Sequence, residues 1–133
     1  MSLMLTLITL LALSGCATRG PATVGTPVTL TDVAEVAGRW AGLSDMPGHR
    51  NEDQYLEVTV HRDGTYQASA ARTIGLMDAQ GRVELSDGRL QVWGERGTRG
   101  TATLFALKGE RTLQVEMTDS HGGRVTARLR PKP

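Results

Sequence analysis

Residues 55–70 read YLEVTVHRDGTYQASA, and this stretch indicates the class of fold. Apolar and polar side chains alternate over Leu56–Val60, which is the two-residue period of a strand with one buried face. Asp63 and Gly64 come next, and an Asp-Gly pair supplies the positive φ angles that a tight hairpin turn requires. The alternation resumes over Tyr66–Ala70. The stretch therefore predicts an antiparallel β-hairpin.

The same signature recurs along the rest of the chain. Alternating segments predict about eight strands, near 38–44, 54–62, 65–73, 81–86, 89–95, 101–108, 111–118 and 123–130. Turn signals separate them at Asp87-Gly88, Gly109-Glu110 and Gly122-Gly123, with looser loops at 78–81 and 97–100. The chain is therefore expected to be all-β, with short turns between neighbouring strands.

The strand order favours a closed barrel. Short turns make sequential antiparallel pairing the default topology. The one helix expected is a turn at 31–36, where Asp32 and Glu35 form a capping box and Gly38 ends the segment. This turn is too short to cover a sheet, and an open meander would leave one bare face and two free edges. We therefore expect an eight-stranded antiparallel up-and-down barrel, with a two-sheet β-sandwich as the alternative.

The N-terminal segment has the features of an export signal. Residues 3–13 are apolar apart from two threonines, and they are too few to span a bilayer, which needs about 20 residues. They run into Leu13-Ser14-Gly15-Cys16, a large apolar residue followed by two small residues and a cysteine. This tetrapeptide resembles the lipobox of bacterial lipoproteins.

The lipobox resemblance implies a location and a domain organisation. It implies cleavage between Gly15 and Cys16 and attachment of lipid to Cys16, so that the membrane becomes a partner. Ala17 in the next position resembles the outer-membrane sorting pattern. We therefore expect a protein of the cell envelope, held on the outer membrane and facing the periplasm. The expected segments are a signal peptide at 1–15, a flexible linker at 16–30 and a barrel domain at 31–133.

Composition and motifs point away from catalysis. A formal net charge of +1 gives no reason to expect a nucleic-acid partner. The chain has a single cysteine, so an internal disulfide cannot form. His49, His61 and His121 lack neighbouring ligand-type residues at metal spacing, and no serine lies in a nucleophile motif. We therefore expect no catalytic residue, no metal site and no cofactor.

Residues 32–40, which read DVAEVAGRW, are similar to the opening of lipocalins and wider calycin barrels. In that family a short helical turn runs into Gly-x-Trp on the first strand. The resemblance implies that Trp40 closes the floor of the barrel. It also implies that an arginine from the last strand, Arg128 or Arg130, lies over the Trp40 ring as a cation–π partner.

The expected function follows from an eight-stranded barrel. Such a barrel is either filled by its own side chains or holds one small ligand, and both interiors remain open here. The leading expectation is non-enzymatic binding of a small apolar ligand or an envelope component. The alternative is a protein-interaction module, such as a lysozyme-inhibitor-like lipoprotein. Candidate contact residues are Tyr55, Tyr66, Trp93, His49 and Arg50, the last two in a polar loop expected at one mouth.

Overall fold

The computed structural model describes residues 25–45, 54–72, 75–118 and 121–133, and almost all of them belong to one β-sheet. The strands are β1 (Thr26–Val28), β2 (Gly38–Asp45), β3 (Gln54–Val60), β4 (Thr65–Arg72), β5 (Gly75–Ser86), β6 (Arg89–Gly94), β7 (Arg99–Leu107), β8 (Glu110–Thr118) and β9 (Arg124–Pro131). Two short 3-10 helices, η1 (Val33–Val36) and η2 (Glu95–Gly97), complete the described elements.

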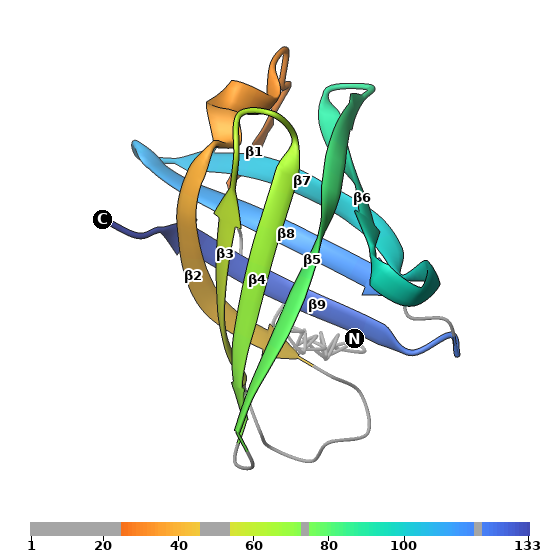
Figure 1. Ribbon diagram of the computed structural model, residues 1–133. Coiled ribbons are helices and arrows are strands. Elements are labelled where there is room, and N and C mark those ends of the chain that lie inside the picture. The colour runs from red at the N-terminus through yellow and green to blue at the C-terminus, as the bar shows by residue number, and fades with distance from the viewer. Residues whose placement is uncertain (1–24, 46–53, 73–74, 119–120) are drawn as a thin grey trace, which may run out of the picture.

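The sheet closes into an eight-stranded up-and-down barrel (Figure 1). Each strand from β2 to β8 pairs antiparallel with the strand that follows it in sequence. β9 then pairs with β2, which joins the two ends of the meander. The predicted barrel is confirmed, because the β2–β9 pairing removes the two free edges that a sandwich would keep.

A ninth strand, β1, lies within the segment that the sequence assigned to a linker. β6 pairs with only the first half of β7, and β1 pairs with the edge that β6 leaves free. Leu30 is buried, and its backbone N–H donates a hydrogen bond to the Gly88 carbonyl oxygen at 2.8 Å. The linker boundary at residue 30 is therefore corrected: Thr26–Val28 and Leu30 belong to the folded domain. Periodicity could not reveal this, because a three-residue strand is too short to show alternation.

Two turn assignments also change. Residues 78–81, expected to form a loop, belong to β5 and pair with β4. The β4–β5 hairpin is therefore longer than the alternation of apolar and polar residues indicated. The turn expected at Gly109-Glu110, between β7 and β8, is centred one residue earlier, on Lys108 and Gly109. Their φ angles are 51° and 80°, and Glu110 already begins β8. Two successive positive φ angles define the turn that matches the twist of a hairpin.

Glycines within the strands allow the sheet to curve into a barrel. A methyl group on Gly42 would lie 1.9 Å from the Arg128 carbonyl oxygen at the β2–β9 closure. A methyl group on Gly100 would lie 1.9 Å from the Glu116 carbonyl oxygen on β8. Backbones approach this closely where a strand bends at a barrel corner, so a side chain at either position would push the strands apart.

The barrel has two different ends. One end carries η1 and the β3–β4, β5–β6 and β7–β8 turns; we call it the floor end. The other carries η2 and the ends of β7, β8 and β9 that face it; we call it the mouth end. Buried apolar side chains of several strands form one core cluster with Val36 of η1: Leu30, Trp40, Val60, Leu90, Leu104, Leu113 and Leu129.

The capping box of η1 makes the stability of this end sensitive to acid. The Glu35 carboxylate accepts hydrogen bonds from the Thr31 backbone at 2.7 Å, the Thr31 hydroxyl at 2.9 Å and the Asp32 backbone at 2.9 Å. These bonds, the Thr31 backbone first, hold the pKa of Glu35 below its ordinary value of 4.5. A folded-state pKa below the unfolded one stabilises the protein fully above about pH 4.5, and this contribution is lost as pH falls through the folded-state value.

We therefore expect Glu35→Gln to flatten the acid limb of the stability curve. The difference in Tm between the wild type and Glu35→Gln should be constant near neutral pH and should shrink below pH 4.5. Thermal melts followed by circular dichroism across this range measure the difference. A Tm difference that does not vary with pH would contradict the assignment of the cap to the ionised carboxylate.

Candidate binding cavity

The barrel encloses a cavity of about 520 Å³ whose walls are mainly apolar. All eight barrel strands except β2 contribute lining residues, as does η2. Toward the floor the lining consists of Leu90, Leu113 and Leu129, and further along it consists of Leu56, Val58, Ala68, Val115, Met117 and Val125. Of the two interiors that the sequence left open, the structure shows the hollow one.

Burial shows how the interior is divided. Leu90, Leu113 and Leu129 are almost completely buried. Leu56 and Val115 also point inward by strand alternation and pack against the core. They are nevertheless only partly buried. Inward-facing apolar side chains keep exposed area when they border a space that water can enter. The barrel is therefore packed solid at the floor and hollow toward the mouth.

Trp40 closes the floor. Its side chain is 2% exposed, and its indole N–H donates a hydrogen bond to the Val36 carbonyl oxygen of η1 at 2.8 Å. The Arg111 guanidinium carbon lies 5.2 Å from the centre of the Trp40 ring, within cation–π range. Arg111 also donates to the Glu35 carbonyl oxygen at 2.6 Å. The arginine therefore joins η1 to the ring beneath it.

The prediction that an arginine of the last strand lies over the Trp40 ring is wrong. Arg128 and Arg130 alternate with the buried Ala127 and Leu129, so β9 turns both arginines to the outer surface. Arg111 lies on β8, where the same alternation places it on the side of the buried Leu113. The cation reaches the floor from the penultimate strand, which the family pattern did not indicate.

Polar groups are confined to the mouth of the cavity. Asp78, Glu95, Arg96 and Thr98 contribute to the lining there, and Glu95 accepts a hydrogen bond from the Gln80 side chain at 3.0 Å. None of the four comes from the floor-end turns. A ligand inside the barrel would therefore meet apolar walls along its length and polar groups at one end.

Tyr66 reaches from β4 toward this polar end. The residue is 8% exposed, and its ring packs over Gly81, where a methyl group would lie 2.8 Å from the Tyr66 hydroxyl oxygen. The hydroxyl also lies beside Gly94, next to η2. Burial raises the pKa of Tyr66 above its ordinary value of 10.0, and the nearby Glu95 carboxylate raises it further. The hydroxyl therefore stays protonated at neutral pH and remains a hydrogen-bond donor.

The structure does not gather the sequence-derived contact residues into one site. Tyr66 lines the cavity, whereas Tyr55 and Trp93 lie on the outer surface with 43% and 40% exposure. His49 and Arg50 lie outside the described residues, as do Gly15 and Cys16. Sequence reasoning selected aromatic and charged residues and passed over the aliphatic lining, although inward alternation marked Val115 and Met117 as interior.

Within residues 25–45, 54–72, 75–118 and 121–133, no group of three or more His, Cys, Asp or Glu side chains could hold a metal ion. No helix in these ranges is long and apolar enough to cross a membrane.

Comparison with known proteins supports the fold class, a closed antiparallel β-barrel. The chain is similar to a redesigned β-barrel, at 11% sequence identity and a TM-score of 0.52, over 80% of this chain and 99% of the other. It is also similar to a de novo designed fluorescence-activating β-barrel, at 16% identity and a TM-score of 0.48, over 77% and 100% of the two chains. No protein-family profile and no curated protein matches the sequence. At such identities the likeness concerns the fold alone.

Proposed function

We propose that this protein binds one small apolar or amphiphilic ligand inside its barrel without altering it chemically. The observation that carries the proposal is the apolar cavity of about 520 Å³. This volume falls within the range of about 300–1,000 Å³ typical of small-molecule sites. With about 30 Å³ for each methylene-sized group, the cavity holds on the order of 15 such groups, the size of a single acyl chain.

The proposed affinity is moderate. Each buried methylene contributes about 0.8 kcal/mol, so a chain that buries about twelve gains roughly 10 kcal/mol before association costs. Those costs are at least about 4 kcal/mol, which leaves about 6 kcal/mol and a Kd of tens of micromolar. A ligand polar group that accepts a hydrogen bond from the Tyr66 hydroxyl would add to this value and would orient the chain with its polar end at the mouth.

Titration with cis-parinaric acid, a fluorescent fatty acid with a single unbranched chain, tests the proposal. Fluorescence should rise on binding and saturate at one molecule per barrel, and an unlabelled fatty acid should displace the probe. Mass spectrometry of lipid that co-purifies with the protein would identify a natural ligand. An absence of saturable probe binding by folded protein would refute the proposal and would favour a protein-interaction module.

One observation favours that second candidate. Leu43 and Tyr55, both exposed, are directly opposed residues on the outer face of β2 and β3. Neighbouring exposed apolar side chains are typical of a small contact patch for another protein. Such a module would retain partner binding after the cavity had been filled, so the two candidates respond differently to the same cavity variant.

We also propose that the barrel is held on an envelope membrane by lipid on Cys16. The support is the lipobox-like segment that ends in Cys16, the chain's one cysteine. We expect Cys16→Ser to move the protein from the membrane pellet to the soluble fraction, because serine offers no thiol for lipid attachment. Fractionation of cells with immunoblotting measures the distribution. Ser14→Ala is the matched control, since it keeps a small residue, and it should stay with the membrane. A Cys16→Ser protein that pellets like the wild type would contradict this proposal.

A further inference from the structure

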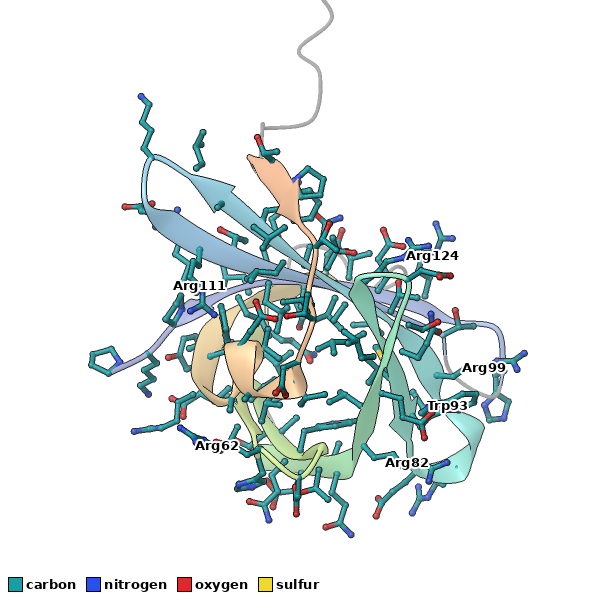
Figure 2. All side chains as sticks on the ribbon, turned by 90° about the horizontal axis from the view of Figure 1, so that it is seen from above. Arg62, Arg82, Trp93, Arg99, Arg111 and Arg124 are labelled. Carbon is teal, nitrogen blue, oxygen red and sulfur yellow. The ribbon has the colours of Figure 1, made fainter. Side chains whose placement is uncertain are left out.

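A row of outward-facing side chains runs around the barrel from β5 to β9, and from β6 onward it follows the mouth end. The strand register aligns Arg82 with Trp93, Trp93 with Arg99, Arg99 with Thr118, and Thr118 with Arg124. Figure 2 shows Arg82, Trp93, Arg99 and Arg124 extending from one side of the barrel, away from Arg62 and Arg111. We call these four residues the arginine–tryptophan row. It places three cations and an exposed indole on one surface.

The charges of the row are available for an external partner. Arg99 and Arg124 are exposed, and neither forms an ion pair with any residue in the described part of the chain. Arg82 lies 3.7 Å from the Glu84 carboxylate, but both side chains are more than half exposed, so this contact is weak. The row itself contains no acidic residue. An anionic surface would therefore meet uncompensated positive charge.

Most of the row lies at the end of the barrel that carries the cavity mouth. Arg99 and Arg124 begin β7 and β9, and Trp93 is the penultimate residue of β6, immediately before η2 and the cavity mouth. The next outward row toward the floor carries carboxylates, Glu84 on β5 and Glu116 on β8. Asp78 and Glu95 also lie at the mouth, but the exposed Arg96 of η2 lies there with them. The arginines of the row therefore add positive charge at the end that carries η2, with the carboxylates Glu84 and Glu116 behind them.

We propose that the barrel docks mouth-first on an anionic lipid surface through the arginine–tryptophan row, so that an acyl chain passes between bilayer and cavity. This inference rests on the proposed function and names the source of its ligand. Arginines bind lipid phosphates, and tryptophan is enriched at the membrane–water interface because its ring is apolar and its N–H is polar. Trp93 and Arg99 directly flank residues 94–98, four of which line the cavity at its mouth.

A lipid surface fits the row better than a nucleic acid does. Proteins that bind single-stranded nucleic acid use several aromatic side chains on which successive bases stack. The row has one aromatic residue, and its aligned positions are otherwise arginine and threonine. One indole is sufficient to enter a headgroup region but cannot form a stacking platform.

Docking is compatible with the anchor proposed at Cys16. About ten residues separate Cys16 from Thr26, and ten extended residues reach at most about 35 Å. A nine-residue strand such as β8 is about 30 Å long before it is tilted in a barrel. The connecting chain is therefore long enough to let the mouth face the membrane that holds the anchor.

Fluorescence quenching of the full-length protein on vesicles tests the docking. The vesicles contain brominated phosphatidylcholine with or without about one part in four of phosphatidylglycerol, an anionic lipid. Trp93 is one of only two tryptophans, and the other, Trp40, is buried in the floor. The bromines should quench Trp93 when phosphatidylglycerol is present and should quench little in its absence. Trp93→Phe should remove the quenched component.

The charge requirement is tested by paired variants with the same net charge. An arginine near an anionic surface raises the binding constant about five-fold. The double variant Arg99→Gln with Arg124→Gln should therefore lower the ratio of docked to undocked protein about 30-fold. Arg62→Gln with Arg89→Gln removes two exposed arginines from the floor end and should leave quenching unchanged. High salt should act like the first pair, because it screens exposed charges.

Three results would overturn the inference. Quenching by the brominated lipid could be independent of phosphatidylglycerol, or the two arginine pairs could have equal effects. A single-stranded oligonucleotide, added at the same concentration of negative charge as the vesicles carry, could also displace the protein from the vesicles and so abolish the quenching. Titration with cis-parinaric acid separates this failure from failure of the proposed function. Loss of quenching with intact probe binding refutes docking alone. Absence of probe binding with intact quenching refutes the cavity function and leaves the docking.

Discussion

Replacing Val115 by tryptophan is expected to lower the affinity for cis-parinaric acid about 50-fold. Val115 lies on β8, lines the cavity and is only partly buried, so a larger side chain extends into space that a ligand would occupy. The added indole displaces on the order of three ligand methylenes, each worth about 0.8 kcal/mol when buried. Fluorescence titration of the folded variant measures the change.

The neighbouring residue provides the control for this prediction. Gln114 lies on the same strand but lines a groove on the outer surface. Gln114→Trp adds a similar side chain without entering the barrel and should leave the affinity unchanged. Circular dichroism shows whether both variants fold. Equal affinities for Val115→Trp, Gln114→Trp and the wild type would show that the probe binds elsewhere.

Replacing Trp40 by alanine is expected to lower the free energy of unfolding by about 3–5 kcal/mol, the usual cost of removing a large buried aromatic side chain. Trp40 is 2% exposed and packs beneath η1, which it holds through the hydrogen bond to the Val36 carbonyl oxygen. The substitution also removes the ring under the Arg111 guanidinium, a contact worth about 0.5–1 kcal/mol. Urea unfolding followed by circular dichroism measures the loss.

Trp40→Phe separates the packing of the ring from its hydrogen bond. It keeps most of the buried aromatic surface and leaves the Val36 carbonyl oxygen without its donor, so its cost should be about 1–3 kcal/mol. The expected order of stability is wild type, Trp40→Phe, Trp40→Ala. A Trp40→Ala protein as stable as the wild type would show that the floor does not carry the stability of the barrel.

The two predictions concern two halves of the same barrel. The floor half contains the almost completely buried Leu90, Leu113 and Leu129 together with the Trp40 closure. The mouth half keeps inward aliphatic side chains partly exposed around a cavity. Close packing at the floor offsets the cost of an interior that is left unfilled toward the mouth.

The sequence predicts the residues of the candidate site less completely than it predicts the fold. The sequence predicts Tyr66, Trp93 and Tyr55 as contact residues. Tyr66 does line the cavity, whereas Trp93 and Tyr55 lie on the outer surface. Alternation states which of two faces a side chain occupies, but it does not state how much space lies in front of it. Val115 and Leu113 show the same inward pattern and both line the cavity, yet Leu113 is almost completely buried and Val115 is only partly buried.

The sequence by itself determined most of the strands and their sequential antiparallel order, and it favoured a closed barrel over a two-sheet sandwich. The alternation in residues 55–70 and its repeats, with short turns between them, made an antiparallel meander the default topology. These are local properties, because strand period and turn geometry depend on residues near one another in the chain.

Only the tertiary structure decided the features that depend on distant residues. It placed β1 on the free edge of β7, chose Arg111 instead of Arg128 or Arg130 for the Trp40 ring, and left a cavity at the mouth. It also aligned arginines from three strands with Trp93 in one row. Each of these features results from strand tilt and register across the closed barrel, which bring together residues whose separation in sequence carries no local signal.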